Sequence, residues 1–414
     1  MRFTRKPAEP GTLQHSSTDH IFYKPLIKRG IAMHYLDNAA TTRVADEVIE
    51  VITDTLRKHY ANASALYTPA ADSENLLEDS RAAVASALGC APGEVLFTAS
   101  GSEGNNIALW GAAFARRNWA KDIVVTGYEH ASLTRPCEQL GALGYTVKVV
   151  KPTAEGRVTP QMLADAVGPH TALVAAIHVN NETGALLDAA ELVKLVKAKN
   201  ARTAVHIDGV QAFMKIPVDV RRLGVDSYTV VGHKIHAPKG IGALYLRKGY
   251  HIEPPYLGGK QEQGLRPGTE NLAYAAGFAK AVELLRPTLA ARYEKAKALN
   301  AGLREQLAAR DGFVLNSPAL EYCSPYILNF SIPGLRSETV LHYLELKKQV
   351  YVSSASACGK GAASHTLQAM GLAAARIDGA LRVSFCADTQ QEDLDALLEG
   401  LDEAAAKLAR AKRK

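Results

Sequence analysis

Residues 172–179, Ala-Leu-Val-Ala-Ala-Ile-His-Val, and residues 204–207, Ala-Val-His-Ile, decide the fold. Both runs are short and almost wholly apolar, which is typical of strands buried on both faces of a parallel sheet. A helical stretch is expected between them over residues 189–199. A strand, a helix and a strand in this order predict one unit of a parallel sheet covered by helices.

The same alternation extends outward from this unit in both directions. Five more apolar strands are predicted, at residues 95–98, 123–126, 146–150, 227–231 and 243–246. Helices are predicted between them, at residues 74–88, 103–117, 132–143 and 159–167. The sequence therefore predicts an α/β fold with a mostly parallel, seven-stranded sheet and helices on both of its faces.

The pattern changes after about residue 275. A long helix is expected over residues 272–310 with a break at Pro287, followed by a strand at 324–332 and a helix at 337–346. A strand at 381–385 and a final helix from about Gln391 complete the chain. We therefore expect a large domain at residues 34–275 and a smaller α+β domain at 276–414, with residues 34–48 packing near the smaller one.

The first 33 residues differ from the rest, because they are polar and lack the apolar core of a signal peptide. They predict a disordered extension, or a start codon assigned too early, since Met33 directly precedes His-Tyr-Leu-Asp-Asn.

The amino-acid composition and net charge indicate which classes of protein are consistent with this sequence. Hydrophobic residues make up 47% of the chain and charged residues 22%, as in ordinary globular enzymes. The five cysteines are scattered without a Cys-x-x-Cys pair, so neither a disulfide framework nor a metal cage is expected and a reducing cytoplasm fits best. No apolar run approaches the roughly 20 residues of a membrane helix. The net charge of +6 comes without an Arg-rich stripe, so we expect no direct nucleic-acid binding.

Two segments predict a site for a carbonyl cofactor. Lys234 follows an apolar strand and precedes a Gly-rich stretch, where a desolvated lysine can form a Schiff base. Asp208 ends another strand, and the carboxyl ends of such strands form the ligand crevice of α/β folds. Each residue also has an ordinary interpretation, as a surface lysine or a helix N-cap. His206 and Asp208 could suggest a metal pair, but two ligands without a third are weak support.

A third segment, Thr98-Ala-Ser-Gly-Ser-Glu-Gly, follows a strand and opens a helix. Small residues at a helix N-terminus allow backbone N–H groups to approach a phosphate, with Gly101 and Ser102 as the cradle. The segment lacks the pattern of a nucleotide-binding P-loop, and such turns also occur without any phosphate.

A fourth segment, Val352-Ser-Ser-Ala-Ser-Ala-Cys-Gly-Lys-Gly, places Cys358 among small residues with Lys360 two positions on. A nearby cation can lower a thiol pKa, and small residues allow the loop to carry the thiol between two places. The alternative is an ordinary buried cysteine.

Taken together, these segments resemble the cysteine desulfurases of the NifS/IscS type, in the class V aminotransferase family. The resemblance spans about residues 34–400 and includes Tyr35-Leu-Asp-Asn-Ala-Ala-Thr-Thr and His178-Val-Asn-Asn-Glu-Thr-Gly. It also includes Gly258-Gly-Lys-Gln-Glu-Gln-Gly-Leu-Arg-Pro-Gly-Thr-Glu-Asn and Pro325-Tyr-Ile-Leu-Asn-Phe-Ser. It implies fold type I of the pyridoxal 5′-phosphate (PLP) enzymes and a homodimer.

The resemblance also implies roles for single residues. Lys234 would hold PLP and shuttle protons, Asp208 would pair with the pyridine nitrogen, and His130 would stack on the ring. The other cofactor-binding residues that it implies are Gly101, Ser102, Asn181, Gln211, His233 and, from a second subunit, Thr269.

For the substrate, Asn181 and Arg382 would bind the carboxylate of L-cysteine, Arg382 through a bidentate pair. Cys358 would take the sulfur as a persulfide while L-alanine leaves. A sulfur-acceptor protein would then receive the sulfur from Cys358, for iron–sulfur cluster assembly or tRNA thiolation.

Five positions depart from the family pattern, among them Ala63 in Asn62-Ala-Ser, where the family has N-P-S. Val231 stands where many members have a phosphate-binding Ser, and Cys386 takes a usual Gly position. Ala355 and Gly359 flank the cysteine in a loop that is about two residues shorter than in the best-known iron–sulfur enzymes. This resembles a short-loop bacterial subset often associated with tRNA thiolation, so the acceptor stays open.

Two alternative functions follow from the same residues. One is a selenocysteine lyase or another PLP enzyme of this fold, although a plain aminotransferase has no need of Cys358. The other is a degenerate scaffold paralogue, against which the presence of Lys234, Asp208, His130 and Arg382 argues.

Overall fold

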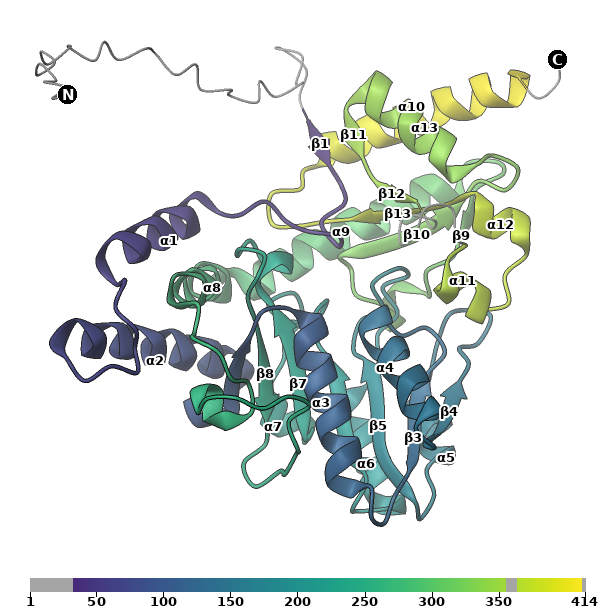
Figure 1. Ribbon diagram of the computed structural model, residues 1–414. Helices are drawn as coiled ribbons and strands as arrows, with labels where there is room; N and C mark the ends of the chain where they lie inside the picture. Colours follow the sequence, from purple (N-terminus) through teal and green to yellow (C-terminus); the bar gives the residue numbers. More distant parts are fainter. Residues whose placement is uncertain (1–32, 355–362, 412–414) are drawn as a thin grey trace, which may run out of the picture.

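The structure, a computed structural model, describes residues 33–354 and 363–411 (Figure 1). The expectations for residues 1–32 and for Cys358 with its neighbours Ala355, Gly359 and Lys360 lie outside the described residues.

A seven-stranded sheet forms the centre of the larger part of the molecule. Its strand order is β2-β8-β7-β6-β5-β3-β4. The strands from β4 to β7 are parallel, whereas β8 runs antiparallel to both of its neighbours. The bounds are β2 (Val95–Thr98), β3 (Asp122–Thr126), β4 (Thr146–Val150), β5 (Thr171–Ile177), β6 (Ala204–Asp208), β7 (Ser227–Val231) and β8 (Gly242–Leu246). All seven predicted strands are present, and the mostly parallel sheet is confirmed.

Helices cover both faces of this sheet. Ile123 and Leu173 pack with Leu133 of α4 (Ala131–Ala142), in a core that also includes α3 (Gly101–Arg116). Their chain neighbours Val124 and Val174 belong to the core on the opposite face. That face is covered by α2 (Thr68–Leu88), α5 (Pro160–Asp165), α6 (Ala189–Lys199), α7 (Val220–Leu223) and α8 (Leu272–Leu285). Alternating side chains thus enter two cores, which explains why the central strands are mostly apolar on both faces.

A smaller antiparallel sheet, of order β12-β13-β10-β9, lies above the large one in Figure 1. Its strands are β9 (Val314–Leu315), β10 (Ile327–Ser331), β12 (Ser353–Ser354) and β13 (Ala380–Ser384). The helices of this part are α9 (Leu289–Ala308), α10 (Ser337–Lys348), α11 (His365–Ala369), α12 (Ala374–Asp378) and α13 (Gln391–Ala411). Pro287 lies in a short 3-10 turn that separates α8 from α9, as the sequence predicted.

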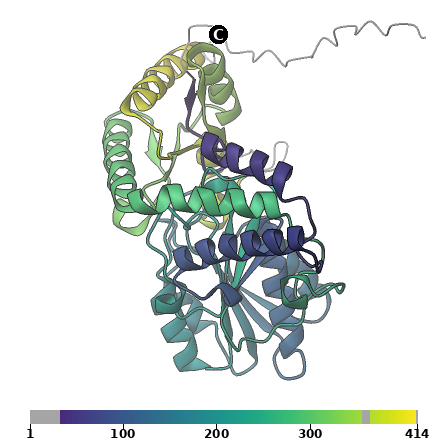
Figure 2. The same cartoon turned by 90° about the vertical axis from the view of Figure 1, so that its left-hand side faces the viewer.

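The N-terminal segment crosses to this smaller sheet. Strand β1 (His34–Tyr35) pairs in parallel with β11 (Val350–Tyr351), and Asp37 forms a bridge with Ser384. The chain then returns to the large part through α1 (Asp46–Lys58), which the sequence analysis did not predict. Figure 2 shows α1, α8 and α2 beside one another on one side of the molecule.

None of the helices among the described residues combines the length and apolar character needed to cross a membrane.

Candidate active site

A cavity of about 450 Å³ lies at the edge of the large sheet where the parallel strands end. Nine of the residues singled out from the sequence line it: Gly101, Ser102, His130, Asn181, Asp208, Gln211, His233, Lys234 and Arg382. Val231 lines it as well. Thr269 is exposed and does not line the cavity, while Cys358 lies outside the described residues. The tertiary structure therefore gathers residues from across the chain at one place, because parallel strands all end at the same edge.

Asp208, the last residue of β6, is a buried carboxylate in the wall of this cavity. Its Oδ2 accepts a hydrogen bond from the Asn105 amide at 2.8 Å, and its Oδ1 accepts one from the Val210 N–H at 3.0 Å. Burial raises the pKa of Asp208, while these donors and the positive charge of Lys234 oppose that rise. A buried carboxylate facing a cavity favours a ligand that brings a positive charge or an N–H donor.

His206 does not form a metal pair with Asp208. Its Nε2 lies 3.0 Å from Asn105 Oδ1 and its Nδ1 lies 2.9 Å from Ser227 Oγ, so both ring nitrogens are occupied. Burial lowers the pKa of His206 to about 3, which keeps the ring neutral. His206 therefore orients Asn105, and Asn105 in turn holds Asp208.

Lys234 enters the cavity from a short 3-10 turn (Gly232–Lys234) directly after β7. Its ammonium donates to the Ala39 and Ala40 carbonyls, each at 2.6 Å. The preceding His233 has its pKa lowered to about 4, first by burial and then by the neighbouring lysines. The turn thus presents a lysine amine beside a neutral imidazole.

The N-terminus of α3 points at the same cavity. Ser100 caps this helix by accepting from the Glu103 N–H at 3.1 Å, and Gly101 and Ser102 form its first turn. A Cβ on Gly101 would lie 2.7 Å from the Val210 side chain, so only glycine fits there. The first N–H groups of a helix have no partner within it and carry partial positive charge, which suits an anion.

His130 and Gln211 occupy other walls of the cavity. His130 caps α4, and its Nδ1 accepts from the Ser132 N–H at 3.1 Å, which fixes the ring orientation. Gln211 donates through Nε2 to the Ala39 carbonyl and accepts from the Lys215 ammonium at 2.9 Å. Both side chains are thereby held in defined orientations.

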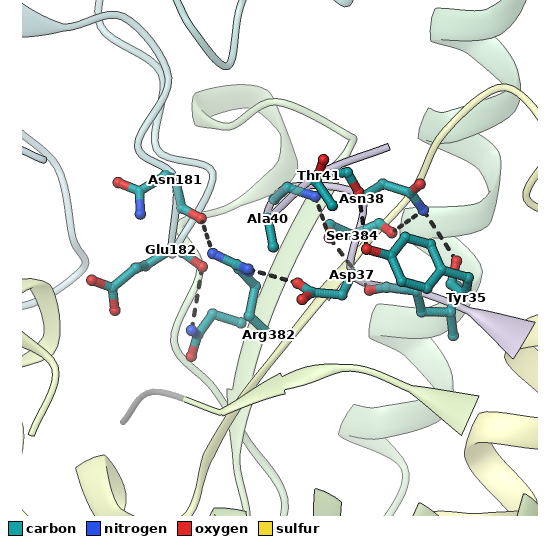
Figure 3. A network of polar contacts seen from close by, with 12 residues as sticks. Tyr35, Asp37, Asn38, Ala40, Thr41, Asn181, Glu182, Arg382 and Ser384 are labelled. Carbon is teal, nitrogen blue, oxygen red and sulfur yellow. Dashed lines mark hydrogen bonds and ion pairs between the residues drawn. The ribbon is translucent and has the colours of Figure 1, made fainter. Parts of the chain in front are cut away.

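Arg382 of β13 reaches the cavity from the smaller sheet, as Figure 3 shows. Its Nη1 donates to the Asn181 carbonyl at 2.9 Å, and its Nη2 forms an ion pair with Asp37 at 2.7 Å. The Arg382 Nε–H is buried without a hydrogen-bond partner. The guanidinium therefore lies at the junction of β13, the N-terminal segment and the loop after β5.

The described residues on either side of the segment that contains Cys358 lie at this cavity or contact a residue that lines it. Ser353 and Ser354, the last described residues before it, line the cavity wall. After it, the Ser364 hydroxyl donates to the Glu182 carboxylate, and Glu182 also lines the cavity.

Sequence reasoning missed three contributors to this site: Asn105, Ser132 and Asp37. Asn105 follows Gly101 by one helical turn, so a helix over this segment predicts that the two share a face. Ser132 follows His130 by two residues and donates to it. Nothing in the sequence pattern signals the pairing of Asp37 with Arg382, which depends on the crossing of the N-terminal segment.

The conserved-domain model of aminotransferase class V matches residues 34–397, and the chain belongs to this family, whose members are PLP-dependent. A cysteine desulfurase of Trichormus azollae is 36% identical over 376 residues, which cover 90% of this chain and 93% of that protein. A NifS/IcsS protein homolog of Lactobacillus delbrueckii subsp. bulgaricus is 37% identical over 374 residues, covering 90% and 97%.

Two solved structures are also similar. A NifS-like protein superposes with a TM-score of 0.85 at 33% identity, covering 91% of this chain and all of that one. SspA in complex with cysteine superposes with a TM-score of 0.75 at 30% identity, covering 85% and 99%.

Proposed function

We propose that this protein is a PLP-dependent cysteine desulfurase, which converts L-cysteine to L-alanine and takes the sulfur onto Cys358. The observation that carries the proposal is the content of one cavity: the Lys234 amine, the buried Asp208 carboxylate and the N-terminus of α3. The relatives named cysteine desulfurase and the cysteine complex of SspA support the choice of reaction and substrate.

The cavity fits PLP at three chemically different points. Lys234 supplies the amine for the aldehyde, and the Asp208 carboxylate is the complement of a protonated ring nitrogen. Gly101, Ser102 and His233 offer hydrogen-bond donors for the phosphate. Val231, where many family members have a Ser, contributes no hydroxyl. When bound, PLP supplies an electron sink for the carbanion formed at the substrate Cα.

His130 and Gln211 would contact the two sides of the cofactor ring, His130 at its face and Gln211 at its hydroxyl. The Ser132–His130 and Lys215–Gln211 hydrogen bonds support these roles, because they hold both side chains before any ligand arrives.

The substrate carboxylate would bind at Arg382 and Asn181. Arg382 contacts Asp37 through Nη2 at 2.7 Å and the Asn181 carbonyl through Nη1 at 2.9 Å, so a substrate carboxylate that binds both Nη atoms would displace these partners. The unpartnered Nε–H of Arg382 is a further donor for the incoming group. Lys234 would then take the Cα proton and return one to the carbon fragment.

Cys358 would complete the reaction as nucleophile. Its thiolate forms a bond with the substrate sulfur while the sulfur–carbon bond breaks; the electrons of that bond stay with the carbon fragment, which is protonated and leaves as alanine. Cys358 follows Ser354 of the cavity wall by four positions, and an extended chain of four residue steps spans up to about 14 Å. The thiol is therefore within reach of the cavity.

The persulfide would pass to a sulfur-acceptor protein, of iron–sulfur cluster assembly or of tRNA thiolation. We also propose a homodimer. Thr269 is exposed and outside the cavity lining, which suits a residue that acts in a partner's site. Exposed apolar side chains on α1 and at the start of α2 offer a surface for the partner.

The decisive experiment incubates the PLP-loaded protein with L-cysteine, then measures alanine and the mass of the Cys358 peptide. Alanine together with one extra sulfur on Cys358, both lost in Lys234→Ala, supports the proposal. Cys358→Ser should still bind PLP but form no protein persulfide. Cys90→Ser is the matched control, since Cys90 does not line the cavity.

Other outcomes of this experiment identify the alternatives. Bound PLP without alanine or persulfide contradicts a desulfurase and favours another PLP reaction. A strong preference for selenocysteine over cysteine assigns a selenocysteine lyase. Absence of PLP binding favours a scaffold.

A further inference from the structure

A second cluster of reactive side chains lies outside the cavity. His236, Cys386 and Asp388 each offer one ligand atom, and these atoms all lie within 4.8 Å of one another. Across residues 33–354 and 363–411, no other group of three His, Cys, Asp or Glu side chains comes together in this way. We propose that these three residues bind a zinc ion, which links the loop after β7 to the loop after β13.

The backbone holds His236 in place on both sides. Its N–H donates to Thr42 Oγ1 at 2.7 Å, and its carbonyl accepts from the Ala45 N–H at 3.0 Å. His236 has a φ of 62°, a left-handed conformation that few residues other than glycine adopt. These contacts fix the main chain that carries the His236 ring.

The ring of His236 is oriented as metal-binding histidines usually are. Its Nδ1 lies 3.0 Å from the Arg43 carbonyl, so Nδ1 carries the proton and donates it. Nε2 is then the unprotonated nitrogen. Metal-binding histidines characteristically donate their other ring N–H to a carbonyl or carboxylate, which fixes the tautomer and the ring.

Cys386 and Asp388 come from one turn after β13. The Cys386 N–H donates to Thr389 Oγ1 at 3.0 Å, and the Thr389 N–H donates to the Cys386 carbonyl at 3.4 Å. These two hydrogen bonds close the turn. Asp388 is exposed and can move, whereas Cys386 is mostly buried. Zinc bonds of about 2.0–2.3 Å place tetrahedral ligands roughly 3.3–3.8 Å apart, so binding requires only a small inward movement of the flexible carboxylate.

The ligand chemistry selects zinc. Thiolate and imidazole together favour zinc over calcium or magnesium, which prefer oxygen ligands. Three protein ligands leave a fourth position for water, and a surface hollow of about 220 Å³ beside His236 and Asp388 gives access to it. Glu47 lines this hollow and attracts a cation, whereas Asp46, which also lines it, is paired with Arg43 at 2.6 Å.

Two basic side chains lie on the inner side of the cluster. Lys215 and Arg292 line the small cavity behind His236 and Cys386. Burial lowers the pKa of Lys215 to about 7, so Arg292 is the constant positive charge here. Arg292 repels a cation, so zinc should bind more weakly here than at a four-cysteine structural site.

The proposed zinc site lies between a loop of the large sheet and a loop of the small sheet. His236 follows Lys234 by two residues after β7 of the large sheet, and Cys386 follows β13 of the small sheet, which carries Arg382 (Figure 1). The ion would therefore link the two sheets directly behind the cavity. Because it binds the folded state, it should also raise the unfolding temperature.

The test uses the full PLP-loaded chain carrying Cys358→Ser, so that the sulfur-carrying thiol does not bind metal. After chelator treatment and dialysis against zinc chloride, we expect one bound zinc per chain by mass spectrometry of the metal. Cobalt(II) in its place should give a thiolate charge-transfer band and the intense visible bands of tetrahedral cobalt.

Asp388→Asn, His236→Gln and Cys386→Ser should each weaken zinc binding at least tenfold. Asp388 is exposed, so its variant tests the site without disturbing the core. Cys90→Ser, which removes another partly buried thiol, should leave the zinc content unchanged. Equal zinc affinity in Asp388→Asn and Cys90→Ser, or a cobalt spectrum without the thiolate band, would overturn the proposal. Neither readout depends on desulfurase activity.

Discussion

The surroundings of Asp208 in the cavity determine which ligand groups its carboxylate stabilises. Its carboxylate is buried and accepts two hydrogen bonds from neutral donors, Asn105 and Val210. Such a group stabilises a protonated nitrogen placed against it far more than water would. The neighbouring Lys234 places a positive charge near Asp208. The Lys234 amine, however, is the group to which PLP is proposed to attach covalently.

Asp208→Asn should therefore lower the rate of alanine formation by at least about a hundredfold while the protein still folds. An amide cannot supply the negative charge that keeps a ring nitrogen protonated. The measurement is kcat for alanine formation together with the PLP content. Asp208→Glu, which retains the charge, should keep more activity than Asp208→Asn; equal rates in the wild type and Asp208→Asn would contradict the assignment.

Glu129 is a buried acid beside the cavity residue His130. Burial raises its pKa to about 8, although its Oε1 accepts from the Thr126 hydroxyl and the Ile177 N–H. Its Oε2 has no hydrogen-bond partner. At neutral pH this side chain is therefore mostly protonated in the folded protein, whereas in the unfolded chain it ionises near pH 4.3.

The native state consequently binds one more proton than the unfolded state between about pH 5 and pH 8. Stability from Glu129 is complete below that window and falls as pH rises through it, by on the order of 1 kcal/mol per pH unit. Glu129→Gln, which does not titrate, should flatten this dependence. Urea unfolding midpoints of both proteins at about pH 5, 6.5 and 8 provide the check, and parallel curves would show that Glu129 is ionised in the native state.

At the scale of elements, a buried ion pair holds the loop of residues 258–271 against β2. Arg81 of α2 contacts both Glu262 carboxylate oxygens, at 2.6 and 3.1 Å, and the Phe97 N–H donates to the same carboxylate at 2.9 Å. Glu262 is 5% exposed and has a left-handed φ of 44°. This glutamate, part of a family motif, thus anchors the loop that carries Thr269.

Glu262→Gln should lower the free energy of unfolding by about 3–5 kcal/mol, because it removes the buried counter-charge of Arg81 and leaves only the exposed Glu78 beside it. Glu78→Gln is the matched control. Glu78 pairs with the same arginine at 3.1 Å but is itself exposed, so its loss should cost less than about 1 kcal/mol. Urea unfolding of the two variants distinguishes them, and similar small losses would show that the buried pair contributes little.

The bounds of the strands and helices show which elements the local sequence pattern predicts accurately. Strands β2, β4 and β7 have the bounds predicted for them, because each is a short run rich in β-branched and apolar residues. Helix α2 begins at Thr68, six residues before its predicted start at 74. Its first turn is largely exposed, with Pro69 near the N-terminus, so no apolar stripe marks it.

At the scale of the whole molecule, exposed apolar side chains follow one another from α1 to the start of α2. Ile49 and Leu56 lie seven residues apart on one side of α1, and Leu66 and Tyr67 precede α2. Leu66 is fully exposed, which is unusual for leucine outside an interface.

We expect the protein to have about twice the mass of the 44.4 kDa chain in light scattering. Leu56→Asp combined with Leu66→Asp should shift it toward the monomer, and alanine formation should fall because the partner's Thr269 is lost. Leu346→Asp is the control, since Leu346 is equally exposed but lies on α10. A wild-type monomer at micromolar concentration would contradict the dimer.

Local sequence patterns were enough to predict the α/β fold, the order of the seven strands along the chain, and four cavity residues: Gly101, Ser102, Asp208 and Lys234. They were enough because buried strands and helix starts leave local patterns, and ligand residues follow strand ends. The resemblance to a known family added His130, Asn181, Gln211, His233 and Arg382. The pairing of Asp37 with Arg382, and the approach of His236 to Cys386 and Asp388, became visible in the three-dimensional structure alone. These contacts join the N-terminal segment, the large sheet and the small sheet, and no local pattern records which distant loops will meet when two sheets pack together.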